Sequence, residues 1–168
     1  MSGPTGDGRF LTFDGAVSGT GSFAGNVRFE GGLSPGASPA LQQASTVVFA
    51  ATNTLHMELG GHVRGTEYDA IDATGSITLG GSLEVVLLGQ FVPGAGDVFD
   101  LLSASHITGS FASQVFPTLG AGLTWHTAIL AGQTGEIFQL TVAAVPEPSE
   151  WLLIIAGGVL LAARRRRG

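Results

Sequence analysis

Short runs of alternating apolar residues, separated by glycine pairs, constrain the fold of this chain more than any other feature. These runs contain Val47 and Phe49, then Leu55, Met57 and Leu59, then Ile77 and Leu79, and then Leu83, Val85 and Leu87. Glycine pairs precede or separate these runs at Gly31-Gly32, Gly60-Gly61 and Gly80-Gly81. Period-two alternation is typical of strands with one buried face, and glycine pairs are turn signals. The pattern predicts an all-β body, with Leu83, Val85 and Leu87 facing inward together.

Two all-β architectures fit this pattern. In a β-sandwich, the segment from Ile77 to Leu83 would be a hairpin with a Gly-Gly turn. In a parallel β-solenoid, each coil would contain one or two short strands and a turn. Weak self-similarity favours the solenoid, because Gly-Ser-apolar triplets at residues 21–23, 75–77 and 109–111 each open an apolar stretch. Periodicity alone leaves both architectures open.

The charge distribution limits which classes of molecule could bind the body of the protein. Residues 1–144 hold eleven carboxylates against three arginines, Arg9, Arg28 and Arg64, which is a formal balance of −8. An acidic body repels phosphate backbones, so nucleic-acid binding is excluded. The chain contains no cysteine, which removes disulfides and thiolate metal sites from consideration.

The order of several short elements resembles the C-terminal stretch of β-helical, autotransporter-passenger-like exported proteins. The stretch begins with GLSPGASP at residues 32–39, continues through residues 65–75 and 93–102, and ends with GLTW at residues 122–125. The likeness covers roughly residues 25–142. It implies a right-handed parallel β-helix.

The segment VPEPSEWLLIIAGGVLLAARRRRG, residues 145–168, is organised differently from the rest of the chain. Trp151–Ala163 is a run of thirteen residues without charge, and four arginines follow it. As a helix this run would span about 20 Å, less than the roughly 30 Å of a hydrocarbon core. A buried C-terminal helix of the domain is the alternative, but such a helix would show a polar face, and this run has none. The arginines predict a cytoplasmic end, with the acidic body on the other side of the membrane.

This segment resembles the PEP-CTERM sorting signal of Gram-negative bacteria, in which a Pro-Glu-Pro triplet precedes a short apolar helix and an arginine cluster. The resemblance implies recognition by an exosortase-type enzyme, processing near the triplet, and delivery to the cell surface or the exopolysaccharide matrix. The recognition residues it implies are Pro146, Glu147 and Pro148. The expected membrane helix consists of Trp151, Leu152, Leu153, Ile154, Ile155, Ala156, Gly157, Gly158, Val159, Leu160, Leu161, Ala162 and Ala163. The expected topology determinants are Arg164, Arg165, Arg166 and Arg167.

The expected organisation is therefore a β-solenoid body at residues 1–142, an extended linker at 143–150, a transmembrane helix at 151–163 and a cytoplasmic tail at 164–168. Residues 1–8 contain neither a basic region nor an apolar core of the kind that export signals carry. We expect a missing upstream part, with a signal peptide and further coils.

Residues that could carry chemistry are few. His56, Glu58 and His62 lack a recognised metal-ligand spacing. Glu67, Asp69 and Asp72 form the densest acidic cluster, with Arg64 nearby. These are nominally the components of a polysaccharide lyase, but calcium needs six to eight oxygen ligands that no motif here supplies. The alternative is that Asp69 and Asp72 solvate a turn between coils. Convergence of the four residues on one groove would favour the enzyme.

The sequence predicts a non-enzymatic, exported surface or matrix protein, structural or adhesin-like, with no cofactor and no metal site. The partners expected are an exosortase-type enzyme, the membrane through the C-terminal helix, and exopolysaccharide. A polysaccharide-active β-helix enzyme is the alternative.

Overall fold

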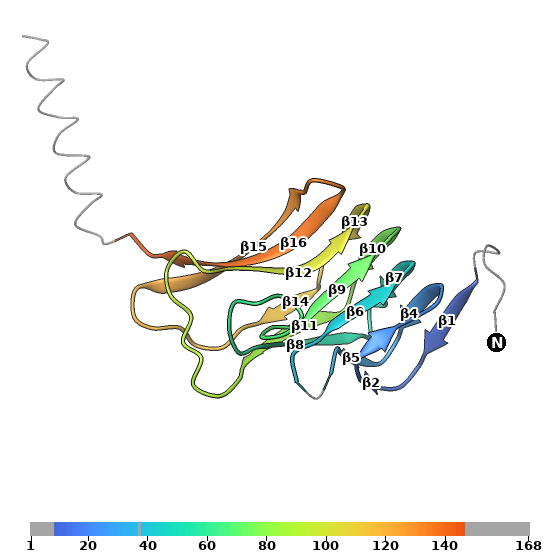
Figure 1. Ribbon diagram of the computed structural model, residues 1–168, viewed down its shortest axis with the longest axis horizontal. Coiled ribbons are helices and arrows are strands. Elements are labelled where there is room, and N and C mark those ends of the chain that lie inside the picture. Colours follow the sequence, from blue (N-terminus) through green and yellow to red (C-terminus); the bar gives the residue numbers. More distant parts are fainter. Residues whose placement is uncertain (1–8, 37, 147–168) are drawn as a thin grey trace, which may run out of the picture.

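The computed structural model describes residues 9–36 and 38–146. All helices and strands assigned within these residues are β-strands. The strands form an elongated stack (Figure 1). The all-β prediction is confirmed for the described part of the chain. Strands enter the stack in a repeating order, so that every third strand joins the same sheet.

Three sheets, here named A, B and C, run the length of the stack. Sheet A contains β1 (Phe10–Phe13), β4 (Asn26–Phe29), β7 (Thr46–Phe49), β10 (Ser76–Leu79) and β13 (His106–Gly109). Sheet B contains β2 (Val17–Ser18), β5 (Gly32–Ser34), β8 (Thr54–Leu59), β11 (Ser82–Leu87) and β14 (Ser113–Val115). Sheet C contains β3 (Gly21–Ser22), β6 (Leu41–Ala44), β9 (Ala70–Ala73), β12 (Val98–Ala104), β16 (Glu136–Ala144) and β15 (Leu123–Ala131), in that spatial order.

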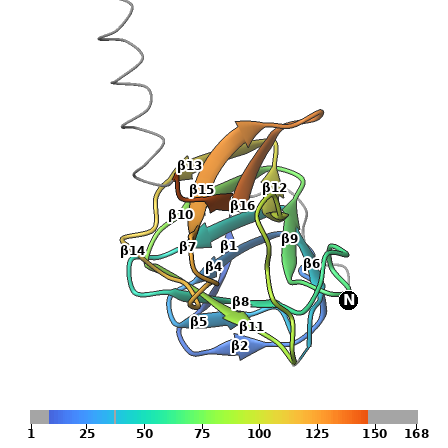
Figure 2. The same ribbon diagram turned by 90° about the vertical axis from the view of Figure 1, so that its left-hand side faces the viewer.

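All pairs in sheets A and B are parallel, as are the pairs from β3 to β12 in sheet C. Successive strands therefore wind through A, B and C as a parallel β-solenoid. We call β1–β3 coil 1, β4–β6 coil 2, β7–β9 coil 3 and β10–β12 coil 4. A view along the stack shows the three sheets around a common interior (Figure 2).

The hairpin alternative for the segment from Ile77 to Leu83 is wrong. β10 and β11 belong to different sheets, and Gly80-Gly81 makes the corner between them. Gly81 has φ +66°, and a Cβ atom there would collide with the carbonyl oxygen of Asn53 in the coil below. This corner thus requires glycine both for its backbone conformation and for the close approach of the neighbouring coil.

The core consists of columns of side chains that repeat from coil to coil. In sheet A the aliphatic column is Leu11, Val27, Val47, Ile77 and Ile107, each in register with the next. Beside it the rings of Phe13, Phe29 and Phe49 stack at centroid distances of 5.4 and 6.0 Å. Burial of these apolar side chains between coils is the main stabilising term.

Sheet B confirms the strand register predicted from the sequence. Leu83 and Val85 are buried on β11, and Leu87 packs against the same core. Their register partners on β8 are Leu55, Met57 and Leu59, which are also buried. The period-two pattern therefore identified the inward face of both strands correctly.

The end of the stack departs from the parallel pattern expected through residue 142. β16 pairs antiparallel with β12, and β15 pairs antiparallel with β16. The two strands form a hairpin that extends sheet C beyond sheets A and B. β16 continues to Ala144, two residues into the segment expected as linker.

Candidate functional site

The segment expected to act as a sorting signal begins directly after the last described strand, β16. The amide of Val145 donates a hydrogen bond to the carbonyl oxygen of Gly122 (2.8 Å), and Pro146 is exposed. Glu147, Pro148, the run 151–163 and Arg164–Arg167 lie outside the described residues. Across residues 9–36 and 38–146, no helix is long and apolar enough to span a lipid bilayer.

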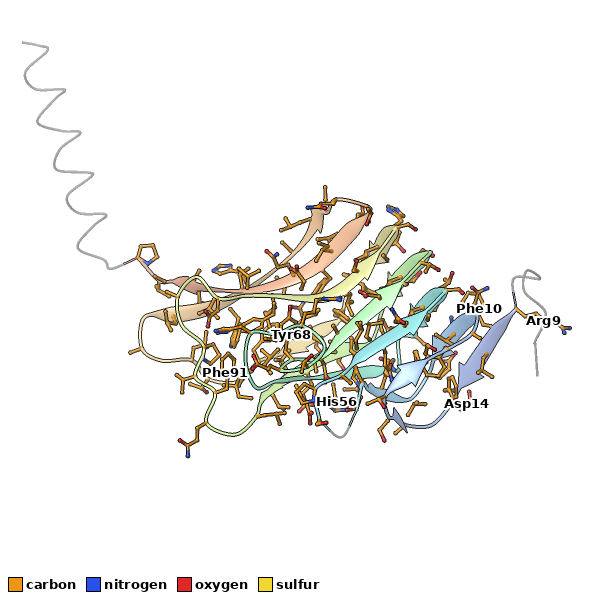
Figure 3. The ribbon with its side chains drawn as sticks, viewed as in Figure 1. Arg9, Phe10, Asp14, His56, Tyr68 and Phe91 are labelled. Atoms are coloured by element: carbon orange, nitrogen blue, oxygen red, sulfur yellow. The ribbon has the colours of Figure 1, made fainter. Side chains whose placement is uncertain are left out.

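The polar and charged residues that could take part in catalysis or binding lie at the corner between sheets B and C, where the connecting loops are longest. The loop at 60–69 joins β8 to β9, and the loop at 88–97 joins β11 to β12. We call these two loops the long-loop corner. Tyr68 and Phe91, labelled in Figure 3, lie on these two loops.

Arg64 connects the first of these loops to the outer face of sheet C. Its Nη2 atom lies 2.7 Å from Oδ1 of Asp72, and its Nε donates to the carbonyl oxygen of Asp100 (2.7 Å). Oδ1 of Asp100 accepts a further hydrogen bond from the side-chain amide of Gln139 (2.7 Å). The register of β12 shifts between Asp100 and Leu102, so this polar network surrounds a β-bulge.

Tyr68 secures the same bulge from the interior. Its side chain is buried, and its hydroxyl accepts a hydrogen bond from the amide of Asp100 (3.2 Å). Burial raises the pKa of the Tyr68 phenol. The ring packs edge-to-face on Phe99 at 5.3 Å, so Tyr68 acts as a packing residue with a satisfied hydroxyl.

Asp69 is fully buried and joins two coils. Oδ1 accepts from the amide of Ala40 (2.8 Å), and Oδ2 accepts from the amide of Glu58 (2.8 Å). Burial raises the pKa of Asp69 to about 6; the two hydrogen bonds act in the opposite direction, and the charge of Glu58 adds to the rise. Both oxygens of Asp69 bind backbone amides, which is a structural role.

Glu67 has a local role in its own loop. Its Oε2 atom accepts hydrogen bonds from the amides of His62 (2.8 Å) and Val63 (3.0 Å). The bond from Val63, followed by that from His62, lowers the pKa of the Glu67 carboxyl. Glu67 therefore stabilises a turn, whereas Asp69, which was expected to solvate a turn, is buried.

The four residues of the predicted cluster do not converge on one groove. Arg64 and Asp72 form a pair, whereas Asp69 and Glu67 bind separate sets of backbone amides. An open hollow of about 440 Å³ is lined by Ser22, Gln43 and Asp72, among others, but by none of the other three residues of the cluster. In the described part of the chain, no group of three His, Asp or Glu residues is placed to hold a metal ion.

Three of the four histidines lie against carboxylates that sequence reasoning did not assign to them. His56 lies 3.1 Å from Glu84, His62 lies 3.5 Å from Asp97, and His106 lies 2.9 Å from Glu136. His56 and Glu84 face each other because β8 and β11 pair in register. The signal that would have found this pair is the spacing between successive coils.

An aromatic chain runs along the long-loop corner. Phe91 contacts His62 at 5.1 Å and Phe99 at 6.1 Å, and Phe99 in turn contacts Trp125 at 6.3 Å. Trp125 donates its indole hydrogen to the carbonyl oxygen of Pro117 (2.8 Å). These rings pack the loops of successive coils onto one another.

No model of a known protein family matches this chain, and no curated protein matches it.

Proposed function

We propose that the chain is an exported cell-surface or extracellular-matrix protein, structural or adhesin-like, that is sorted through a PEP-CTERM-type signal. The observation that carries the proposal is the order of elements in the tail. Pro146-Glu147-Pro148 is followed by the uncharged run Trp151–Ala163 and by Arg164–Arg167. A proline-rich extended triplet beside an apolar helix suits a membrane-embedded processing enzyme, and the arginines favour a cytoplasmic C-terminal end.

The geometry of the body supports processing at this position. The last strand ends at Ala144, and the hydrogen bond from the Val145 amide precedes the triplet. Cleavage beyond Pro146 would therefore leave every described strand and every described buried side chain in place. The released product would keep the acidic body intact, as a soluble surface or matrix component requires.

For the body we propose a right-handed coil, the common hand of parallel crossovers, and a role that rests on shape and surface. Its carboxylates at the long-loop corner are engaged with the backbone or with Arg64. This leaves the alternative of a polysaccharide-active enzyme without the convergent cluster that favoured it. Exopolysaccharide is the partner that the proposed destination implies.

The test is expression in a bacterium that has an exosortase, with an export signal supplied. We expect the mature surface protein to lack Trp151–Gly168 by intact-mass analysis. Alanine substitution of Pro146, Glu147 and Pro148 should leave membrane insertion intact and block release, so that the full-length protein accumulates in the inner membrane. Gln90→Ala, in an exposed loop, serves as a control and should be released normally. A surface protein that still ends at Gly168 would show that the tail is a plain anchor.

A further inference from the structure

The strand β15 lies at the edge of sheet C, and only one of its two sides has a neighbour among the described strands. It spans Leu123–Ala131 and pairs with β16 over its whole length. Both of its connections are described, the loop at 116–122 that follows β14 and the turn at 132–135 that leads into β16. Its place at the edge therefore follows from the path of the chain between β14 and β16.

The hydrogen bonding of the hairpin shows which backbone groups of β15 point to the open side. The amide of Val145 donates to the carbonyl oxygen of Gly122 (2.8 Å). Because bonding alternates along an antiparallel pair, the even-numbered residues of β15 bond to β16 and the odd-numbered ones point away from it. The amides and carbonyls of Trp125, Thr127 and Ile129 therefore face the open side. They have no hydrogen-bond partner within residues 9–36 and 38–146.

β15 lacks the features by which natural sheets protect an exposed edge. Its sequence, LTWHTAILA, contains no Asp, Glu, Lys, Arg or Pro, and its pairing with β16 continues without a register shift. Short strands, charged residues, prolines and bulges are the usual protection against edge-to-edge pairing. The last strands of the other two sheets have such protection. β14 contains only three residues, and on β13 the amide of Ile107 donates to the carboxylate of Glu136.

The two halves of β15 are covered differently. In the first half, Trp125 packs against Phe116 at 6.0 Å and donates its indole hydrogen to the carbonyl oxygen of Pro117. In the second half, Ile129 and Leu130 are 41% and 44% exposed. Trp125 and Ile129 lie on the same face of the strand, because side chains alternate with period two. The loop at 116–122 thus covers one end of this face and leaves the other end bare.

We propose that β15 pairs antiparallel with β15 of a second copy, so that sheet C continues across a two-fold axis into a second molecule. The register that uses the whole strand places the axis at Thr127, its middle residue. Trp125 of each copy then lies opposite Ile129 of the other. These are hydrogen-bonded pairs, since the backbone groups of all three residues face the open side. The interface is isologous and closed, which gives a dimer.

Two observations select β15 of a second copy as the occupant. Antiparallel pairing places the covered half of each strand beside the bare half of the other, so that Phe116 and Pro117 of each copy approach Ile129 of the other. The second observation is length. Among the described strands, every other edge strand has four residues or fewer, so only a second β15 matches the full edge. Self-pairing also creates no like-charge contact, because the strand carries no charged residue. The dimer does not depend on how the chain is sorted.

Cysteine substitutions test the contact and its register, because the chain has no cysteine of its own. With the axis at Thr127, His126 of one copy lies opposite Ala128 of the other in a non-hydrogen-bonded pair. The two Cα atoms of such a pair are about 4.5 Å apart, a separation that a disulfide can span. Full-length His126→Cys and Ala128→Cys chains are mixed in detergent micelles and mildly oxidised. Intact-mass analysis should show the mixed disulfide as the main dimer.

Thr78→Cys provides the control, because it lies on β10, an interior strand of sheet A, and should stay monomeric. Absence of a disulfide dimer from the mixture would overturn the proposal. A mixed product no more abundant than random collision gives would overturn it too, because the proposed register brings residue 126 opposite residue 128.

Sedimentation equilibrium of the full-length chain in micelles provides a second measurement that needs no thiol. Ile129→Lys should raise the dimer dissociation constant at least about tenfold, because it places a charge at the pairing edge. Val86→Lys, at a residue of similar exposure (38%) on β11, should leave the dissociation constant unchanged. Circular dichroism checks that both variants fold. A wild-type chain that is monomeric at all concentrations, or a dimer that Ile129→Lys does not weaken, would contradict the proposal.

Discussion

One column of sheet A passes through two very different regions of the molecule. Leu11, Val27, Val47, Ile77 and Ile107 occupy equivalent positions, yet their exposed fractions are 57%, 1%, 1%, 0% and 4%. The residues are chemically similar and face the same interior. The difference therefore lies in their neighbours: a residue in the middle of the stack has a described strand on both sides, whereas β1 with Leu11 has one described neighbour, β4.

The two ends of this column also differ in how their strand edges are managed. At β13 the amide of Ile107 donates a hydrogen bond to the carboxylate of Glu136. The hairpin β15–β16 contributes side chains that cover the interior at this end. At β1 no described residue has the equivalent role. The sequence pattern places an apolar side chain on the inward face of its strand. Whether that side chain is buried depends on the adjacent coil.

The largest loss of stability should come from shortening a side chain in the middle of this column. Ile77→Ala should reduce the free energy of unfolding by about 2–5 kcal/mol, since it removes contacts with both neighbouring coils and leaves a cavity. Leu11→Ala should cost less than about 1 kcal/mol, because much of its surface is already in water. Chemical denaturation of both variants measures the two costs. Equal costs for the two variants would show that coil 1 is covered by something within a single chain.

An intermediate effect is expected for the buried carboxylate that joins coils 2 and 3. Asp69→Asn should cost about 2–3 kcal/mol at acidic pH, because an amide can accept only one of the two hydrogen bonds and turns a donor toward the other buried amide. The folded-state pKa of about 6 exceeds the ordinary value of 3.8. The folded chain therefore binds this proton more tightly than the unfolded chain does. The stabilisation is present below pH 4 and is lost as pH rises through 6.

The difference in unfolding free energy between wild type and Asp69→Asn should accordingly shrink as the pH is raised from 4 to 7. Denaturation of both proteins across this range provides the measurement. Using the difference removes the contributions of the other carboxylates. A difference that grows with pH would mean that the carboxylate is held in its charged form by its two amide partners.

The smallest losses of stability are expected for substitutions of two arginines, one that holds the bulge in β12 and one in a surface ion pair. Arg64→Ala should cost about 1–2 kcal/mol, because it breaks the link to Asp72 and the hydrogen bond to the Asp100 carbonyl at the bulge. Arg28→Ala, which loses only the surface pair with Glu30 on sheet A, should cost about 0–1 kcal/mol. Thermal unfolding of both variants decides between them. A larger loss for Arg28 would mean that the long-loop corner contributes little to stability.

Local sequence pattern predicted the strands and their buried faces, as Leu83 and Val85 show. It did not decide whether Ile77 and Leu83 belong to one hairpin or to two sheets, because a Gly-Gly pair suits both connections. The tail motif at Pro146, Glu147 and Pro148 was likewise visible from the residues alone. What it does in a cell stays a prediction, since its last two residues lie outside the described part.

The candidate site shows the limit of local inference more clearly. Arg64, Glu67, Asp69 and Asp72 are close in sequence, but they point to different partners in the fold. The partners that matter most, Asp100 for Arg64 and Ala40 for Asp69, lie 36 and 29 residues away. Such pairings depend on the length of each coil, and the coils differ: equivalent positions in sheet A are separated by 16, 20, 30 and 30 residues.

The sequence by itself determined that this chain forms short strands with one apolar face, because alternation and glycine act over a few residues. It also determined the acidic character of the body and the composition of the tail. Only the tertiary structure decided which strands stack on which and where the last strands reverse direction. These depend on hydrogen bonds and contacts between segments many residues apart, whose register follows from how each corner loop closes.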